Sequence, residues 1–228
     1  MHVIGIVGRC YYNKDGQKIV QTHDSVRRFL CSRDDVVCIT LLPQEDIDYL
    51  SIDKGTDSVS SKVDYLLELC DAFVVPGGTY QYQFDEYVLK YAISHDKPLL
   101  AICLGFQALC SMFAKERNQF DMSVRLDLEH HLGKGNEYKH DVMIQEHTKL
   151  MNIIGEKKIR VNSVHHDIVN FDMDTLVINA FSDDGIIEGV EYPNKKFILG
   201  VQWHPEYLVD DNSKKILNQF IQSIKKDS

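Results

Sequence analysis

The stretch PLLAICLGFQALCSMF, residues 98–113, places a cysteine where an apolar run gives way to a helical pattern. Ala101 and Gly105 flank Cys103 at a spacing of two, which is typical of a sharp strand-to-helix turn that lifts the middle side chain above a sheet. The free N–H groups at the start of such a helix favour a thiolate and can hold an oxyanion. Cys103 is therefore predicted to be a nucleophile for acyl transfer; the alternative is a small core residue.

The other cysteines are expected to take that plainer role; they are Cys10, Cys31, Cys38, Cys70 and Cys110. None of the six forms a CxxC pair or the dense spacing of a disulfide framework, so we expect a reducing, cytoplasmic environment.

A thiol nucleophile needs a base, and the stretch GVQWHPEYL, residues 200–208, offers one. His204 and Glu206 lie two residues apart, and Pro205 favours an extended residue before it. Both side chains are then expected to project from the same side of a strand end, where the carboxylate would orient the imidazole as in a nucleophile–base–acid triad. By itself a His-Pro-Glu trio is also compatible with a simple turn.

Two glycines follow an apolar run in VVPGGTY, residues 74–80. Glycines at this point permit close backbone approach and expose N–H groups at the carboxyl edge of a sheet, where open α/β folds bind ligands. One of these N–H groups, together with that of Leu104, would form an oxyanion hole with two donors. The alternative is that Gly77 and Gly78 only make a tight turn.

Paired histidines in VNSVHHDIV, residues 161–169, raise the question of a metal site. Further candidate ligands are His130, His131, His140 and His147. None of them shows the HxH or HExxH spacing of zinc ligands, and a cysteine beside zinc would be coordinated. We therefore expect no metal, and a polar loop at the rim of a pocket.

Elements that would position these residues alternate along the chain. Continuous apolar runs predict buried strands, and apolar residues with a period of 3.6 predict helices. The predicted strands are 2–8, 36–42, 72–78, 98–102, 160–164, 176–181, 186–192 and 197–203, and the predicted helices are 59–70, 84–95, one starting after residue 103, and 213–226. Without a repeat or a clear linker, one α/β domain over residues 1–228 is expected.

Charge and hydropathy exclude several classes of partner. The 228 residues carry a net charge of −9, which argues against nucleic acid and anionic membranes, because phosphate binding needs a basic face. No window approaches the roughly 18 apolar residues of a membrane span, and the N-terminal stretch does not have the form of a signal peptide. We expect a soluble protein that is not exported.

Taken together, the strand followed by PGG, the pattern A-x-C-x-G-x-Q and the late HPE resemble the class I glutamine amidotransferase superfamily. The resemblance covers nearly the whole chain and implies a flavodoxin-like α/β fold, with a mostly parallel sheet covered by helices on both faces. Within the superfamily, VNSVHHDIV, DGIIEGVEY and GVQWHPE resemble the free-standing γ-glutamyl hydrolases of the peptidase C26 branch.

The resemblance assigns a role to particular residues. Cys103 would be the nucleophile, His204 the base and Glu206 its orienting carboxylate, with oxyanion donors at Gly78 and Leu104. The residues it implies for the γ-glutamyl pocket are Gln107, Ser163, Val164, His165, His166 and Asp167.

This chain departs from the branch in three places. Leu104 stands where the hydrolases usually have Arg, Ala101 replaces a usual glycine, and the segment after Gly78 is short.

The implied activity is cleavage of a small γ-glutamyl amide, such as a γ-glutamyl-γ-aminobutyrate-like conjugate, through a glutamyl thioester and without a cofactor. One alternative is a glutaminase subunit that delivers ammonia to a separate synthase partner. A second is a non-enzymatic binding module on the same fold, against which the intact Cys103, His204 and Glu206 count. A homo-oligomer is compatible with each.

A thiol reagent and a chelator should act differently on this protein. Iodoacetamide is expected to abolish hydrolysis of a γ-glutamyl amide, because a single thiol carries the chemistry, whereas EDTA should leave the rate unchanged. Activity that is lost on chelation and restored by zinc would instead indicate a metal at the His165–His166 loop.

Overall fold

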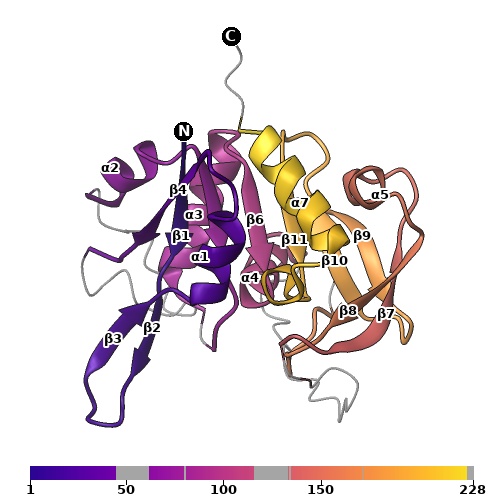
Figure 1. The fold of residues 1–228 in the computed structure, drawn as a ribbon, viewed down its shortest axis with the longest axis horizontal. Helices are drawn as coiled ribbons and strands as arrows, with labels where there is room; N and C mark the ends of the chain where they lie inside the picture. The colour runs from indigo at the N-terminus through magenta and orange to yellow at the C-terminus, as the bar shows by residue number, and fades with distance from the viewer. Residues whose placement is uncertain (45–61, 80, 116–132, 134, 171, 225–228) are drawn as a thin grey trace.

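The computed structural model describes residues 1–44, 62–79, 81–115, 133, 135–170 and 172–224 (Figure 1). Two of the histidines considered as metal ligands, at positions 130 and 131, lie outside the described residues, as do the ends of two predicted helices, at 59–61 and 225–226.

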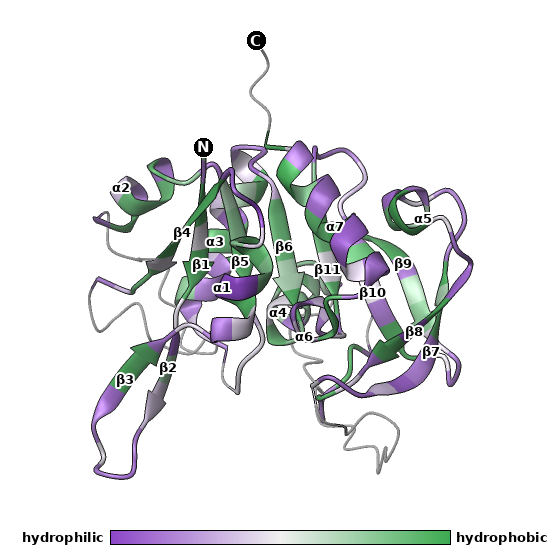
Figure 2. Ribbon diagram, in the orientation of Figure 1, coloured by the Kyte–Doolittle hydropathy of each residue, from purple (hydrophilic) through white to green (hydrophobic). Residues whose placement is uncertain are grey.

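A nine-stranded sheet forms the centre of the molecule, in the order β4-β1-β5-β6-β11-β10-β9-β7-β8. Its first five strands are parallel, and they are β4 (Val36–Leu41), β1 (His2–Val7), β5 (Ala72–Val75), β6 (Leu99–Ile102) and β11 (Ile198–Val201). Every residue of β5, β6 and β11 is buried, as expected for strands covered on both faces. Figure 2 shows these central strands coloured as hydrophobic.

Beyond β11 the pairing becomes antiparallel. The strands that continue the sheet are β10 (Ile187–Glu191), β9 (Val177–Ser182), β7 (Tyr138–Ile144) and β8 (Lys158–Asn162). A separate hairpin, β2 (Arg9–Tyr12) with β3 (Lys18–Gln21), extends from the end of β1 away from the body of the molecule (Figure 1).

Helices cover both faces of the sheet. One apolar cluster joins the sheet to α1 (Asp24–Leu30), α5 (Lys149–Ile154) and α7 (Asp211–Gln222), and a second cluster joins it to α2 (Lys62–Glu68), α3 (Gln83–Ser94) and α4 (Leu104–Met112). A short helix, α6 (Pro205–Leu208), follows β11. The α/β architecture predicted from the sequence is confirmed.

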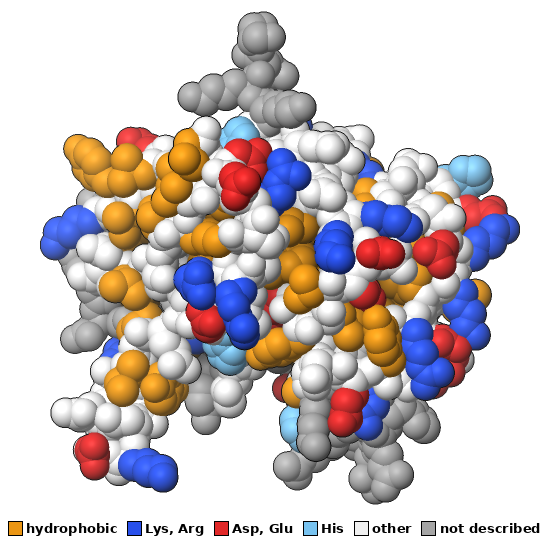
Figure 3. Space-filling view, viewed as in Figure 1, with side chains coloured by type: hydrophobic (Ala, Val, Ile, Leu, Met, Phe, Trp, Pro, Cys, Tyr) orange, Lys and Arg blue, Asp and Glu red, His pale blue; other side chains and the backbone are white. Residues whose placement is uncertain are grey.

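Acidic and basic side chains are interspersed over the face that α1 and α7 cover (Figure 3). Among the described residues, no helix combines the length and apolar composition that crossing a membrane requires.

All eight predicted strands are present within a few residues of the expected bounds. Several elements were not predicted: the β2–β3 hairpin, α1, β7, α5 and α6. They are short or carry exposed polar positions, so they lack the long apolar run or period on which such predictions depend.

Glu191 links the antiparallel half of the sheet to α5, and we expect its loss to lower the stability of the fold. Its buried carboxylate accepts hydrogen bonds from the backbone N–H groups of Lys149 (2.7 Å) and Leu150 (3.1 Å) and from Nδ2 of Asn179 (3.0 Å). Glu191→Ala leaves these donors without their acceptor, and should lower the free energy of unfolding by about 3 kcal/mol.

The measurement is urea denaturation of the variant and of Glu146→Ala, whose carboxylate forms an exposed ion pair with Lys157. The control should match the wild type, because exposed ion pairs contribute little. Equal midpoints for all three proteins would contradict the bridging role of Glu191.

Candidate active site

Cys103 occupies a strained turn between β6 and α4. Its φ and ψ are 52° and −108°, and its backbone N–H donates to the carbonyl of Val201 in the neighbouring strand β11 at 2.8 Å. Such a turn holds a side chain up at the carboxyl edge of the sheet. The turn also requires glycine at 105, because a Cβ there would lie 2.0 Å from the carbonyl oxygen of Val75.

His204 and Glu206 reach the same edge from the end of β11. His204 is the residue before the first turn of α6, Pro205 is at its first helical position, and Glu206 lies within it. The prediction that both project from a strand end was wrong in this detail: proline has a φ suited to a helix start, so the chain enters α6. Nδ1 of His204 nevertheless lies 2.7 Å from Oε1 of Glu206, and both residues are buried.

The electrostatics of the three side chains favour an ion pair. Burial raises the pKa of the Cys103 thiol, but the His204 imidazole, as a nearby positive charge and hydrogen-bond partner, more than reverses this and leaves the pKa below its usual value. Burial likewise lowers the pKa of His204, while Glu206 and Cys103 together raise it well above the usual range. Thiolate and imidazolium therefore stabilise one another between these two pKa values.

Asn162, at the end of β8, fixes the backbone that carries the imidazole. Its Oδ1 accepts from the N–H of His204 at 2.9 Å, and its Nδ2 donates to the carbonyl of the same residue at 2.9 Å. Nδ2 also donates to the carbonyl of Gly135. The side chain is fully buried. Asn162 stands in the motif VNSVHHDIV, but its role could not be predicted, because nothing in its residue type reveals a partner 42 positions away.

The PGG segment lies directly beside the thiol and the imidazole. A Cβ at Gly77 would lie 2.8 Å from Cε1 of His204 and 3.4 Å from Cβ of Cys103, so only glycine permits this approach. The side chain of Leu104 contacts the position of Gly78 (3.2 Å from a Cβ there) and is buried. Gly78 and Leu104 are therefore neighbours in the structure, and the role of their N–H groups as oxyanion donors stays a prediction.

The predicted binding residues fall into two groups. Val164 and His166 are both exposed, and Val164 lines the cavity next to Cys103. Ser163 and His165 are buried, and Asp167 is half-buried.

Gln107 is buried in α4 and holds this loop in place. Its Nε2 donates at 3.0 Å both to the carbonyl of Asp167 and to Oε1 of Gln202. Nδ1 of His165 lies 3.0 Å from the same carbonyl, so both side chains anchor the loop.

A cavity of about 220 Å³ opens over the thiol. Its walls include the PGG segment with Thr79, and also Cys103, His204, Glu206 and Val164. Three further lining residues were not predicted from the sequence: His23 and Val26 from the region of α1, and Tyr207 of α6. The rings of Tyr207 and His204 are tilted against one another with centroids 5.0 Å apart. Among these lining residues there is no lysine or arginine.

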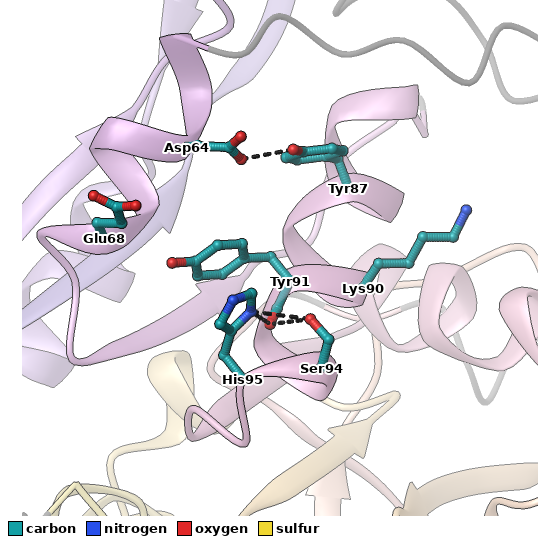
Figure 4. A pocket seen from close by; sticks show the side chains of 7 residues that line it. All are labelled: Asp64, Glu68, Tyr87, Lys90, Tyr91, Ser94 and His95. Carbon is teal, nitrogen blue, oxygen red and sulfur yellow. Dashed lines mark hydrogen bonds between the residues drawn. The ribbon is translucent and has the colours of Figure 1, made fainter.

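A larger hollow, of about 440 Å³, lies between α2 and α3 (Figure 4). Its polar groups bond largely to one another: the hydroxyl of Tyr87 donates to Asp64 at 2.6 Å, and Nδ1 of His95 lies 2.9 Å from the carbonyl of Tyr91. Its seven lining residues include no cysteine. The smaller cavity is therefore the candidate active site, despite its size.

A second imidazole–carboxylate group is buried near the thiol. Nε2 of His165 and Nε2 of His140 lie 3.6 Å and 3.7 Å from Oε1 of Glu188. Burial lowers the pKa of His165, but Glu188 outweighs this and raises it. The ligand atoms of these three residues lie within 4.8 Å of one another, which would suit metal ligands. Ion pairing between the histidines and Glu188 accounts for the same distances. The expectation that the protein holds no metal stays a prediction.

Comparison with known proteins places this fold among glutamine amidotransferase domains. The structure superposes with a TM-score of 0.68 on the glutaminase domain of Trypanosoma brucei CTPS with bound acivicin, at 19% identity and covering 98% of this chain and 94% of that one. The Peptidase C26 family model matches residues 80–206, and the chain belongs to this family.

Related sequences agree with this assignment. A Rickettsia prowazekii protein described as glutamine amidotransferase-like is 30% identical in an alignment 213 positions long that covers 67% of this chain and 76% of that protein. Anthranilate synthase component 2 of Cyanophora paradoxa is 27% identical over 150 residues, 64% of this chain and 70% of its own length. The chain spans 40% to 59% of the length of four further relatives.

The ion pair predicts how the reactivity of Cys103 depends on pH. In the wild type, alkylation by iodoacetamide should reach its plateau below the pH at which ordinary thiols react. In His204→Ala the midpoint should move above that of an ordinary thiol, because burial remains while the positive charge is lost.

Mass spectrometry of the Cys103 peptide across a pH series measures both midpoints. Cys110 serves as an internal control, since burial raises the pKa of its thiol well above the usual value and it should stay unmodified. An unchanged Cys103 midpoint in His204→Ala would show that the imidazole does not stabilise the thiolate.

Proposed function

We propose that this protein is a cysteine hydrolase that cleaves the γ-glutamyl amide bond of a small conjugate and releases glutamate and an amine. The observation that carries the proposal is the buried line from Cys103 through His204 to Glu206, with its thiol pKa below and its imidazole pKa above the usual values. Membership of the Peptidase C26 family supports the reaction class.

In the first half of the reaction, the Cys103 thiolate attacks the γ-carbonyl carbon, and a C–S bond forms. The negative charge moves to the carbonyl oxygen, which accepts hydrogen bonds from the N–H groups of Gly78 and Leu104. As the C–N bond breaks, the His204 imidazolium donates its proton to the departing nitrogen. The products of this half are a glutamyl thioester and a free amine.

In the second half, His204 is neutral and takes a proton from water, which attacks the thioester carbonyl. The C–S bond breaks, the thiolate returns to its ion pair with the imidazolium, and glutamate leaves. Glu206 accepts a hydrogen bond from Nδ1 throughout and keeps Nε2 directed at the reacting atoms. No cofactor takes part in either half.

The cavity favours a small substrate with a neutral amine. Its volume of about 220 Å³ suits a glutamyl group with a short leaving group, and its lining offers no lysine or arginine to pair with a carboxylate on the amine. The side chain of Leu104, where the branch usually has Arg, is buried against Gly78 and is not among the lining residues.

A neutral γ-glutamyl amide is therefore expected to match or exceed γ-glutamyl-γ-aminobutyrate in kcat/KM. The protein is proposed to act as one domain over residues 1–228 in the cytoplasm, on a small molecule and without nucleic acid or membrane.

The names of relatives favour one alternative function. Anthranilate synthase component 2 and CTP synthase are both among the proteins similar to this chain, and their names support a glutaminase that feeds ammonia to a synthase. Under that alternative the isolated chain would hydrolyse glutamine slowly, and a separate synthase subunit would raise the rate.

A screen of γ-glutamyl amides tests the proposal and separates it from the alternative. The purified protein is assayed for glutamate release from glutamine, γ-glutamyl-γ-aminobutyrate and neutral γ-glutamyl alkylamides, with and without candidate synthase subunits. Turnover of an alkylamide by the protein alone is expected. Turnover of glutamine only, and only with a partner, would contradict the hydrolase and establish the glutaminase.

Single substitutions assign the roles. Cys103→Ala should remove essentially all hydrolysis while the fold remains, His204→Ala should be nearly as damaging, and Glu206→Gln should be milder, because an orienting carboxylate contributes less than the base. The kcat/KM of each variant on one amide is the measurement. Cys110→Ala is the matched control, since it removes another buried thiol of α4 and should retain the wild-type rate. A Glu206 variant worse than the His204 variant would reverse the assigned roles.

A further inference from the structure

Arg9 is a buried cation beside the candidate active site that the mechanism above does not use. It begins β2, directly after β1, and only 5% of its surface is exposed. Its Nη1 donates to both carboxylate oxygens of Asp85, at 2.6 Å and 2.7 Å. An arginine that is removed from water in this way needs several strong hydrogen-bond partners, and its remaining partners lie in the candidate active site.

The remaining donors of Arg9 all reach the PGG segment. Nε donates to the carbonyl of Gly77 at 3.1 Å, and Nη2 donates to the carbonyl of Pro76. One guanidinium therefore holds two consecutive carbonyl groups, and Asp85 holds the guanidinium. Asp85 is itself fixed at the start of α3, where it accepts from the N–H of Tyr82 at 3.0 Å.

The geometry of the peptide bond means that these carbonyl contacts also fix the directions of the Gly77 and Gly78 N–H groups. In a trans peptide unit the C=O and the N–H of the next residue point in opposite directions. Because the carbonyl of Gly77 is directed at Arg9, the N–H of Gly78 must point to the other side of the segment. The Pro76 carbonyl, held by Nη2 of Arg9, likewise fixes the direction of the Gly77 N–H. A Cβ at Gly77 would lie 2.8 Å from His204 and 3.4 Å from Cys103, so this peptide unit is next to both side chains.

Glycine makes such an orientation easy to lose. A peptide between two glycines rotates with little steric hindrance, because neither residue has a Cβ. A rotated Gly77–Gly78 unit would place a carbonyl oxygen where the oxyanion needs a donor, and two negative oxygens would repel one another. A fixed donor at that point is worth a large rate factor, since its orientation need not be established during the reaction.

We propose that Arg9 is a positioning residue for the oxyanion hole: anchored by Asp85, it holds the Pro76 and Gly77 carbonyls so that the N–H of Gly78 faces the reacting carbonyl oxygen. This role rests on the proposed acyl-transfer function, but not on the γ-glutamyl substrate. Arg9 does not touch the substrate; it acts only through the peptide units that it holds.

Two reactions of Cys103 separate this role from general support of the fold. Acylation by p-nitrophenyl acetate passes through a tetrahedral oxyanion, whereas alkylation by iodoacetamide does not. The double variant Arg9→Met/Asp85→Asn removes the guanidinium, leaves no unpaired charge, and keeps an acceptor for the N–H of Tyr82. Its acylation rate should fall about 10- to 100-fold, while its alkylation rate changes less than about threefold.

Two further variants complete the experiment. Arg9→Lys keeps the charge but loses the planar fork, so its ratio of acylation to alkylation should lie between those of the wild type and the double variant. Lys149→Met is the matched control: its ammonium also holds two backbone carbonyls, of Tyr192 and Lys195, in the loop before β11, and both rates should equal those of the wild type.

Each result decides the proposal. A lowered acylation-to-alkylation ratio in the Arg9 variants supports it, and Arg9→Lys decides alone if the double variant does not fold. An unchanged ratio, or equal falls in both rates, overturns it. Nitrophenolate release that persists in Cys103→Ala overturns both the nucleophile and the Arg9 role. Since p-nitrophenyl acetate carries no glutamyl group, a failed γ-glutamyl screen would refute only the substrate assignment.

Discussion

The close packing of the Cys103 turn against its neighbouring strand is the constraint on which the site depends. The order β5-β6-β11 places three parallel carboxyl ends side by side, and they are followed in turn by the PGG segment, Cys103 and His204. For α4 to begin directly after Cys103, residue 105 must approach the carbonyl of Val75 too closely for any Cβ. The strained backbone of Cys103 then directs its thiol at the imidazole carried beyond β11, and Gly77, in the PGG segment that follows β5, lies next to both side chains.

Burial determines the electrostatics of this corner. Desolvation alone would leave both Cys103 and His204 neutral, and it is the largest single influence on each. The charged pair prevails because each partner supplies the opposite charge, and because Glu206 supports the imidazolium at 2.7 Å. Two buried side chains hold the backbone around these groups in position. Asn162 forms hydrogen bonds with both the N–H and the carbonyl of His204, and Arg9 donates to two carbonyls of the PGG segment. The backbone of such a site is held rigidly, so its charges and N–H dipoles are already oriented before the reaction begins.

Sequence reasoning succeeded where the signal is local. Five of the eight predicted strands are parallel and were found because buried parallel strands are continuously apolar; the other three were found because their apolar, β-branched runs are bounded by turn residues. The structure also brings together Cys103, His204 and Glu206, which stand in short motifs; their catalytic roles stay a prediction. The two side chains that hold the backbone in position were missed because their partners are distant: Arg9 bonds to residues 67 to 76 positions away, and a polar residue does not reveal which carbonyl it will meet. Helix α1 was missed because it is short and mostly polar, and with it the cavity residues His23 and Val26.

In the proposed mechanism, Cys103 carries the glutamyl group between the two halves of the reaction. Rapid acid quenching of the wild-type protein during turnover of γ-glutamyl-p-nitroanilide, followed by mass spectrometry of its peptides, tests this most directly. The good leaving group makes acylation fast, so the thioester should accumulate. We expect one added glutamyl group on the peptide that contains Cys103. Turnover with no such adduct, or with the adduct on another residue, would contradict it.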